Sequence, residues 1–204
     1  MLELPVQPQL TTSIRRQGPF LIAGLGNPGR KFERNRHNVG FMMLNRLADK
    51  LGETFSHVQS KALVAKCSFI GERVILAKPQ TYMNNTGSAV TSLVHFYQVP
   101  LGNVLIAYDD IDLPLGTLRI RPSGGSAGQK GMQSIIERLG TEEFPRMRIG
   151  TSRPPGKKGA ANYVLQNFRP EELDLLNETL DRAVGATLSF LEFGLDRTMN
   201  SFNS

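Results

Sequence analysis

The chain has 204 residues, of which 40% are hydrophobic, so it can bury a sizeable core as a single domain. No apolar run approaches the roughly 18 residues of a membrane helix, and the only cysteine, Cys67, excludes an intrachain disulfide and agrees with a reducing compartment. With no secretory signal in evidence, we expect a cytoplasmic protein, and the net charge of +6 raises the question of an anionic partner.

Residues 1–19 precede the first strand signal and lack the apolar core of a secretory signal, so we expect a flexible leader there. The leader contains arginines, and Glu3 is its only acid. This composition leaves an organellar transit peptide open as an alternative.

An apolar strand is predicted at residues 20–25, and it runs into glycines with G-x-G-x-x-G spacing, namely Gly24, Gly26 and Gly29. That spacing is typical of dinucleotide-binding loops, in which the third glycine lies in the first turn of a helix. Here Pro28 precedes that glycine, and the following RKFERNRHN has no helical apolar period. The sequence therefore favours a Gly/Pro turn that holds Asn27 at its tip.

The later elements alternate between helices and strands. Strands are predicted at 61–70, 73–78, 103–109, 116–121 and 146–151, and helices at 37–51, 84–97, 130–139 and 170–193. Only Gly71 and Glu72 separate two of the strands, which indicates a hairpin and hence a sheet that is not purely parallel. A glycine-rich loop at 123–131 and a Pro/Gly/Lys loop at 152–160 connect other elements. The alternation predicts one α/β domain with a mixed sheet.

Polar residues follow three of the predicted strands. These residues are Asn27 and His37 after the first strand, Tyr82, Met83 and Asn84 after the strand at 73–78, and Asp109, Asp110 and Asp112 at the end of the strand at 103–109. Strand ends at one sheet edge converge, so we expect one pocket. A histidine that takes a proton from water, with a carboxylate on its other ring nitrogen, would give this pocket hydrolytic chemistry.

Each of these residues also has a simpler structural interpretation. His37 can cap backbone groups at a helix start, the aspartates can form a turn before Pro114, and Asn84 can cap the next helix. Met83 is of a type usually found in cores. The aspartates also resemble a metal site, but no second histidine stands at ligand spacing. The residues alone thus indicate a hydrolytic or binding pocket and go no further.

Basic residues are concentrated in residues 119–158, where nine lysines and arginines stand against three acids. The nine are Arg119, Arg121, Lys130, Arg138, Arg146, Arg148, Arg153, Lys157 and Lys158. If they gather in space they form a face for phosphates, and otherwise they are a solvated surface; charge alone leaves both interpretations open.

Three segments together resemble the bacterial-type peptidyl-tRNA hydrolase family: GLGNPGRKFERNRHNVGF, KPQTYMNNTG and YDDIDLPLGTLRIRPSGGSAG. They occur in the family's order and spacing, and the resemblance covers residues 20–195, which leaves 196–204 as a C-terminal tail. The resemblance implies cleavage of the ester that joins a peptide to the 3′ ribose of tRNA. It also implies a monomeric three-layer α/β/α domain that needs no metal or cofactor and no membrane.

The resemblance further implies roles for single residues. His37 matches the histidine that activates water, Asp109 the carboxylate that keeps it basic, and Asn27 the asparagine that helps discriminate N-blocked peptidyl-tRNA from free aminoacyl-tRNA. Substrate binding is implied for the positions of Phe32, Tyr82, Met83, Asn84 and Lys130, and binding of tRNA acceptor-end phosphates for those of Arg121 and Arg148.

The chain departs from the family pattern in two places. Phe32 stands where the family often has tyrosine, and Gln129-Lys130 stand where it usually has His-Asn. The absent asparagine is expected to bind substrate or position water. Lys130 therefore either directs a charge at a phosphate or marks altered activity.

The sequence leaves two alternatives to the hydrolase. Plant chloroplasts use a relative of this hydrolase as an RNA-binding intron-splicing factor that works with a protein partner, and such a protein would keep the fold and the basic face. The presence of Asn27, His37, Asn84 and Asp109 favours the enzyme. A generic nucleotide-binding protein is disfavoured by the turn after the first strand.

Overall fold

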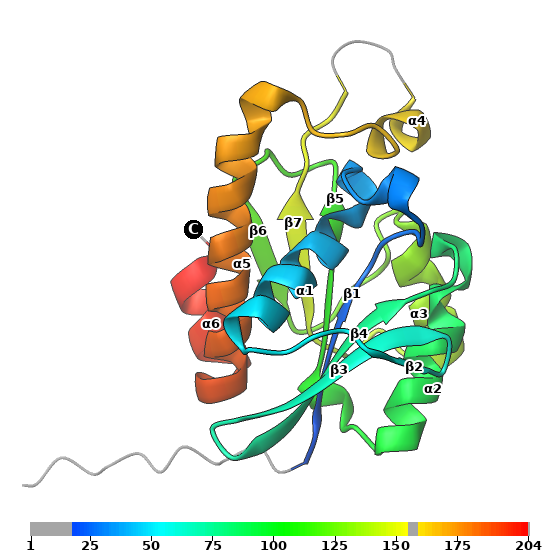
Figure 1. Cartoon of the computed structure of the whole chain (residues 1–204), viewed down its shortest axis with the longest axis vertical. Helices are drawn as coiled ribbons and strands as arrows, with labels where there is room; N and C mark the ends of the chain where they lie inside the picture. The colour runs from blue at the N-terminus through cyan, green and yellow to red at the C-terminus, as the bar shows by residue number, and fades with distance from the viewer. Residues whose placement is uncertain (1–17, 155–158, 204) are drawn as a thin grey trace, which may run out of the picture.

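The computed structural model of the chain describes residues 18–154 and 159–203. Its strands form one seven-stranded sheet in the order β2-β3-β4-β1-β5-β7-β6 (Figure 1). The strands are β1 (Phe20–Gly24), β2 (His57–Gln59), β3 (Ala62–Phe69), β4 (Glu72–Pro79), β5 (Val104–Asp110), β6 (Leu118–Arg121) and β7 (Arg146–Gly150). Neighbouring strands from β4 to β7 pair in parallel, and the outer pairs are antiparallel. The predicted mixed sheet is confirmed.

Helices cover both faces of this sheet. They are α1 (Val39–Lys50), α2 (Thr86–Tyr97), α3 (Lys130–Leu139), α4 (Ala160–Val164), α5 (Leu173–Phe193) and α6 (Leu195–Phe202). Helices α1 and α5 pack on one face and α2 and α3 on the other, which gives the three layers of the expected fold (Figure 1). The predicted starts of the first two helices are 3-10 turns instead, η2 (Arg36–Asn38) and η3 (Met83–Asn85). Among the described helices, none is long and apolar enough to cross a membrane.

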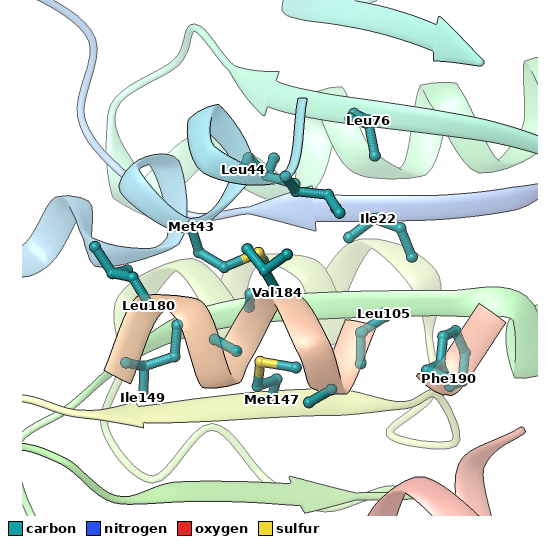
Figure 2. Packing of buried hydrophobic residues seen from close by; sticks show 14 of the residues in the cluster. Ile22, Met43, Leu44, Leu76, Leu105, Met147, Ile149, Leu180, Val184 and Phe190 are labelled. Atoms are coloured by element: carbon teal, nitrogen blue, oxygen red, sulfur yellow. The ribbon is translucent and has the colours of Figure 1, made fainter. Parts of the chain in front are cut away.

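The sequence of β1 explains its place in the middle of the sheet. All five residues of FLIAG are buried, because alternate side chains face opposite layers. Phe20 and Ile22 join the cluster under α1 and α5, whereas Leu21 and Ala23 join the cluster under α2 and α3. Figure 2 shows the first cluster, in which side chains from α1 and α5 interlock above the strands.

The predicted hairpin is confirmed, but its turn lies one residue earlier than expected. Strands β3 and β4 pair from Ala62 with Pro79 to Phe69 with Glu72, so the two turn residues are Ile70 and Gly71. Both have positive φ, 52° and 77°, which is the backbone twist that two-residue hairpins favour. Glu72 therefore belongs to the strand.

The two ends of the chain bear on the predicted leader and tail. Residues 1–17 of the leader, and 155–158 of the predicted loop at 152–160, lie outside the described residues. The expected tail contains most of α6, and it ends on the edge strand β6: Ile120 donates its N–H to Asn203 Oδ1 at 2.6 Å, and Asn203 Nδ2 donates to Ile120 O at 3.0 Å. This asparagine takes up backbone groups that an edge strand would otherwise expose, so residues 196–203 are ordered structure, where the sequence suggested only a tail.

Candidate active site

A cavity of about 580 Å³ opens at the sheet edge where β1 and β5 end. Strand β1 has parallel neighbours on both sides, β4 and β5, and such a position is where open α/β sheets bind ligands. Seven of the predicted site residues line the cavity: Asn27, His37, Tyr82, Met83, Asn84, Asp109 and Lys130. The predicted convergence of the strand ends is confirmed, while the roles of the residues remain predictions.

The glycines after β1 serve close packing. A Cβ on Gly24 would lie 2.3 Å from the carbonyl oxygen of Gly40 in α1, and a Cβ on Gly26 would lie 2.8 Å from the ring of Phe41. No α-helix begins at Gly29: the 3-10 turns η1 (Arg30–Phe32) and η2 follow it, and α1 starts only at Val39. The loop therefore lacks the helix N-terminus that would hold a pyrophosphate.

Three hydrogen bonds, two to Asn38 and one to Met83, hold Asn27 in this loop. Its backbone N–H donates to Asn38 Oδ1 at 2.9 Å, and its backbone oxygen accepts from Asn38 Nδ2 at 2.9 Å. Its side-chain Oδ1 accepts the backbone N–H of Met83 at 3.0 Å. A backbone N–H can only donate, so the oxygen must face Met83. The Nδ2 amino group, which has no partner within the described residues, is left as a donor at the cavity.

His37 and Asp109 form a hydrogen-bonded pair in the cavity. His37 Nδ1 lies 2.9 Å from each oxygen of the Asp109 carboxylate, and their side chains are only 13% and 3% exposed. An ionised carboxylate is only an acceptor, so Nδ1 must carry the proton. In the neutral ring Nε2 then has a free lone pair, which is the arrangement of a general base.

The residue before this histidine, Arg36, joins it to a segment that lies more than 120 positions further along the chain. Arg36 is 1% exposed, and its guanidinium stacks between the rings of Tyr163 and Phe168, at 4.4 and 4.8 Å from their centroids. It also forms an ion pair with Glu172 at 2.5 Å. His37 therefore sits next to a buried support that sequence reasoning missed, because Glu172, the ion-pair partner of Arg36, lies 136 positions away.

Only one of the three aspartates faces the histidine. Asp110 pairs with Arg148, and Asp112 pairs with Arg153 at 2.6 Å. In the part of the chain that the structure describes, no group of three His, Cys, Asp or Glu side chains is placed to hold a metal ion. The cluster that resembled a metal site is thus divided between one catalytic candidate and two ion pairs.

The outer part of the cavity is exposed. Tyr82 is 65% exposed, and Asn84 and Lys130 are exposed at the starts of η3/α2 and of α3. Met83, between the first two, is buried and contributes the backbone N–H that fixes Asn27. Tyr82, Asn84 and Lys130 therefore form a rim, with Met83 beneath it.

Three predicted residues are not among those that line the cavity. Phe32 lies half-buried in η1 with Lys31 Nζ 4.8 Å from its ring centroid, and Arg121 is exposed at the end of β6. Arg148 is engaged by Asp110. Their roles toward substrate and tRNA remain predictions.

Comparison with known proteins agrees with this architecture. The peptidyl-tRNA hydrolase family model matches residues 21–204. A peptidyl-tRNA hydrolase of Thermoanaerobacter sp. (strain X514) is 47% identical over 184 residues, which are 90% of this chain and 99% of the relative. A chloroplastic peptidyl-tRNA hydrolase of Arabidopsis thaliana is 47% identical over 189 residues, 92% of this chain and 66% of the relative.

A solved structure agrees as well. The crystal structure of peptidyl-tRNA hydrolase from Acinetobacter baumannii has a TM-score of 0.85 and 32% sequence identity to the chain, with 91% of this chain and 94% of that one covered. The match of the family model and the identity to relatives both extend over nearly the whole described domain. The chain therefore belongs to the peptidyl-tRNA hydrolase family, as the three sequence segments predicted.

Proposed function

We propose that the chain hydrolyses the ester between peptide and tRNA in peptidyl-tRNA, and that His37 activates the attacking water. The observation that carries this proposal is the buried pair of His37 Nδ1 and Asp109, which leaves Nε2 as a base at a cavity of about 580 Å³.

In the proposed reaction, a water bound at Nε2 attacks the ester carbonyl carbon and gives its proton to His37. Asp109 stabilises the imidazolium that forms. The tetrahedral intermediate then breaks its bond to the ribose oxygen, which takes the proton from His37. The peptide acid gives its remaining proton to solvent, so the products are a free peptide carboxylate, a tRNA with a 3′ hydroxyl and one proton. Only water is consumed, and His37 and Asp109 return to their starting states.

Asn27 would read the substrate beside the scissile ester. Its Nδ2 is a neutral donor with no partner in the described residues, and its Oδ1 is occupied by Met83. A carbonyl oxygen of an N-blocked peptide can accept from this amino group, whereas a free α-ammonium finds only another donor there. This arrangement supports a preference for peptidyl-tRNA over aminoacyl-tRNA.

The tRNA part of the substrate would be bound at the rim and beyond it. We infer that Lys130, Arg121 and Arg148 meet phosphates of the acceptor end, since such contacts give affinity without reading sequence. A hydrolase that acts on many tRNAs needs that tolerance. We also propose that the chain acts as a monomer in the cytoplasm and requires no cofactor.

No observation on the described residues favours the alternative of a splicing factor. A purely RNA-binding protein has no use for a histidine whose tautomer is fixed by a buried carboxylate and whose other nitrogen faces a cavity. The relatives described above are named as hydrolases.

The deciding experiment measures release of N-blocked amino acid from N-blocked aminoacyl-tRNA by the purified chain. We expect turnover by the wild type and its loss in His37→Ala, with tRNA binding and the melting temperature nearly unchanged. His95→Ala, which changes an exposed histidine on α2, is the matched control and should keep full turnover. Near-wild-type turnover in His37→Ala would remove the general-base role.

A further inference from the structure

Gln129 lines the same cavity and contacts Asp109 of the catalytic pair. It is the residue just before α3, in the position that caps the helix N-terminus. Its Oε1 accepts the backbone N–H of Met132 at 2.8 Å, and its Nε2 lies 3.0 Å from Asp109 Oδ1. A weaker contact joins Nε2 to the sulfur of Met83 at 3.4 Å.

The helix fixes which way the amide of Gln129 points. The N–H of Met132 can only donate, so the side-chain oxygen must be the atom that meets it. The amino group is thereby turned toward Asp109 and must donate to it. Asp109 Oδ1 then accepts from two sides, from His37 Nδ1 at 2.9 Å and from Gln129.

Helix capping alone does not account for a glutamine at this position. Serine, threonine, aspartate and asparagine are the preferred capping residues, because their short side chains reach the second or third N–H of the helix. The longer side chain of Gln129 caps and also spans the distance to Asp109. Since an amide does not titrate, this donor is present at every working pH.

We propose that Gln129 is a positioning residue for the hydrolysis: it couples the start of α3 to Asp109 and so holds the carboxylate in line with His37. The inference rests on the proposed function, since it assumes that this pair activates water. It assigns a use to a position at which the chain departs from its family's usual residue.

The first test separates capping from positioning. Gln129→Ser keeps a good capping group but cannot reach Asp109. We expect its melting temperature to stay near that of the wild type and its kcat to fall roughly tenfold to hundredfold, the range for losing a hydrogen bond to a charged group. KM should change little, because both ends of the Gln129 amide are engaged within the protein, by Met132 and by Asp109. The matched control is Gln133→Ser, one turn further along α3, where the exposed side chain bonds only Glu137.

The second test uses pH, which a purely structural role would not move. In Gln129→Glu one carboxylate oxygen still caps Met132, and the other faces Asp109. Two carboxylates this close share a proton at low pH, so the variant keeps a donor there and loses it as pH rises. The ratio of variant to wild-type kcat should therefore fall as the pH rises. The other titratable or charged residues that line the cavity, namely His37, Tyr82, Tyr108, Asp110, Asp112, Lys130 and Arg153, are present in both proteins.

The outcomes separate this inference from the proposed function. Wild-type hydrolysis together with a flat Gln129→Glu ratio and an unchanged kcat in Gln129→Ser would overturn the positioning role and leave the hydrolase intact. If Gln129→Ser folds poorly, the glutamate ratio decides alone, since that variant retains the cap contact to Met132. Absence of wild-type hydrolysis would instead overturn the function on which the inference rests.

Discussion

The inner wall and the rim of the cavity are built in opposite ways. On the inner wall, Asn27, His37 and Asp109 are each fixed by hydrogen bonds of 2.9 to 3.0 Å to groups from other elements. On the rim, the side chains of Asn84 and Lys130 are exposed and have no hydrogen bond or ion pair among the described residues.

This difference separates two kinds of contribution. Groups already in place need no reorganisation when charge develops in the transition state, so the inner wall should govern kcat. Exposed side chains lose rotamer freedom only when substrate binds, so the rim should govern KM and salt dependence. The predictions below break or sharpen this division.

The largest effect is expected for Asp109→Asn. The neutral amide of an asparagine has one acceptor oxygen and no negative charge. It therefore accepts weaker hydrogen bonds from His37 and Gln129 and cannot stabilise the imidazolium. We expect kcat to fall roughly 10³- to 10⁴-fold while the fold is kept, as judged by turnover of N-blocked aminoacyl-tRNA and by the melting curve. Asp112→Asn is the control, since Asp112 pairs with the exposed Arg153. A larger loss in Asp110→Asn or Asp112→Asn would mean that the wrong acid was chosen.

The next effect concerns which substrate is cleaved. Asn27→Asp keeps the oxygen that accepts from Met83 but turns a carboxylate oxygen toward the cavity in place of the amino group. A carboxylate attracts a free α-ammonium, so we expect the ratio of blocked to unblocked ester hydrolysis to fall about tenfold. Asn27→Ala should also lower this ratio, by less. An active variant with an unchanged ratio would remove Asn27 from specificity.

The support behind His37 should appear in stability rather than in chemistry. Although burial acts to raise the pKa of Glu172, hydrogen bonds from Arg36 and Arg169 hold it below its ordinary value in the folded protein. A carboxylate whose pKa is lower in the folded than in the unfolded protein adds to the unfolding free energy at any pH above its unfolded-state pKa. This contribution is lost as the pH falls through the folded-state pKa. Glu172→Gln should lower the unfolding free energy by about 2 kcal/mol near neutral pH and flatten its decline in acid.

Denaturant titrations from neutral to acidic pH measure this effect. Glu171→Gln is the control, because Glu171 is 63% exposed and pairs only with the equally exposed Arg169. Equal acid profiles for wild type and Glu172→Gln would show that the Arg36 ion pair does not stabilise the support.

The sequence predicted the parts of the site that local pattern encodes. Apolar runs predicted β1 and β5. The polar residues that follow these strands predicted that Asn27 and Asp109 would line one cavity. The contacts of Arg36 and Gln129 were not predictable this way. Arg36 joins Glu172 across 136 positions, and Gln129 reaches Asp109 only because the glycine-rich loop brings the start of α3 back to β5. Short elements were missed for a related reason: the three residues of β2 carry no periodic signal, and their pairing with β3 decides their form.

The smallest expected effect lies on the rim, at Lys130. It is the first residue of α3, exposed, and it lines the cavity. A helix N-terminus favours a phosphate, and an ammonium beside it adds a point charge. Each phosphate contact to single-stranded RNA contributes about 0.7 to the slope of log K against log salt. Lys130→Ala should therefore weaken tRNA binding and reduce that slope by about 0.7.

A second variant distinguishes a phosphate ligand from a solvated residue at the place of the family's usual asparagine. Lys130→Asn should raise kcat on a short substrate mimic that lacks the tRNA body, while the reduced salt slope for whole tRNA persists. Arg138→Ala, on the last turn of the same helix, is the matched control for general loss of positive charge. If Lys130→Ala changes affinity and slope no more than this control does, Lys130 binds no phosphate. Of the three exposed rim residues, Tyr82 and Asn84 would then be left to bind substrate. The rim would differ from the inner wall in the exposure of its side chains but would not supply charge for the tRNA.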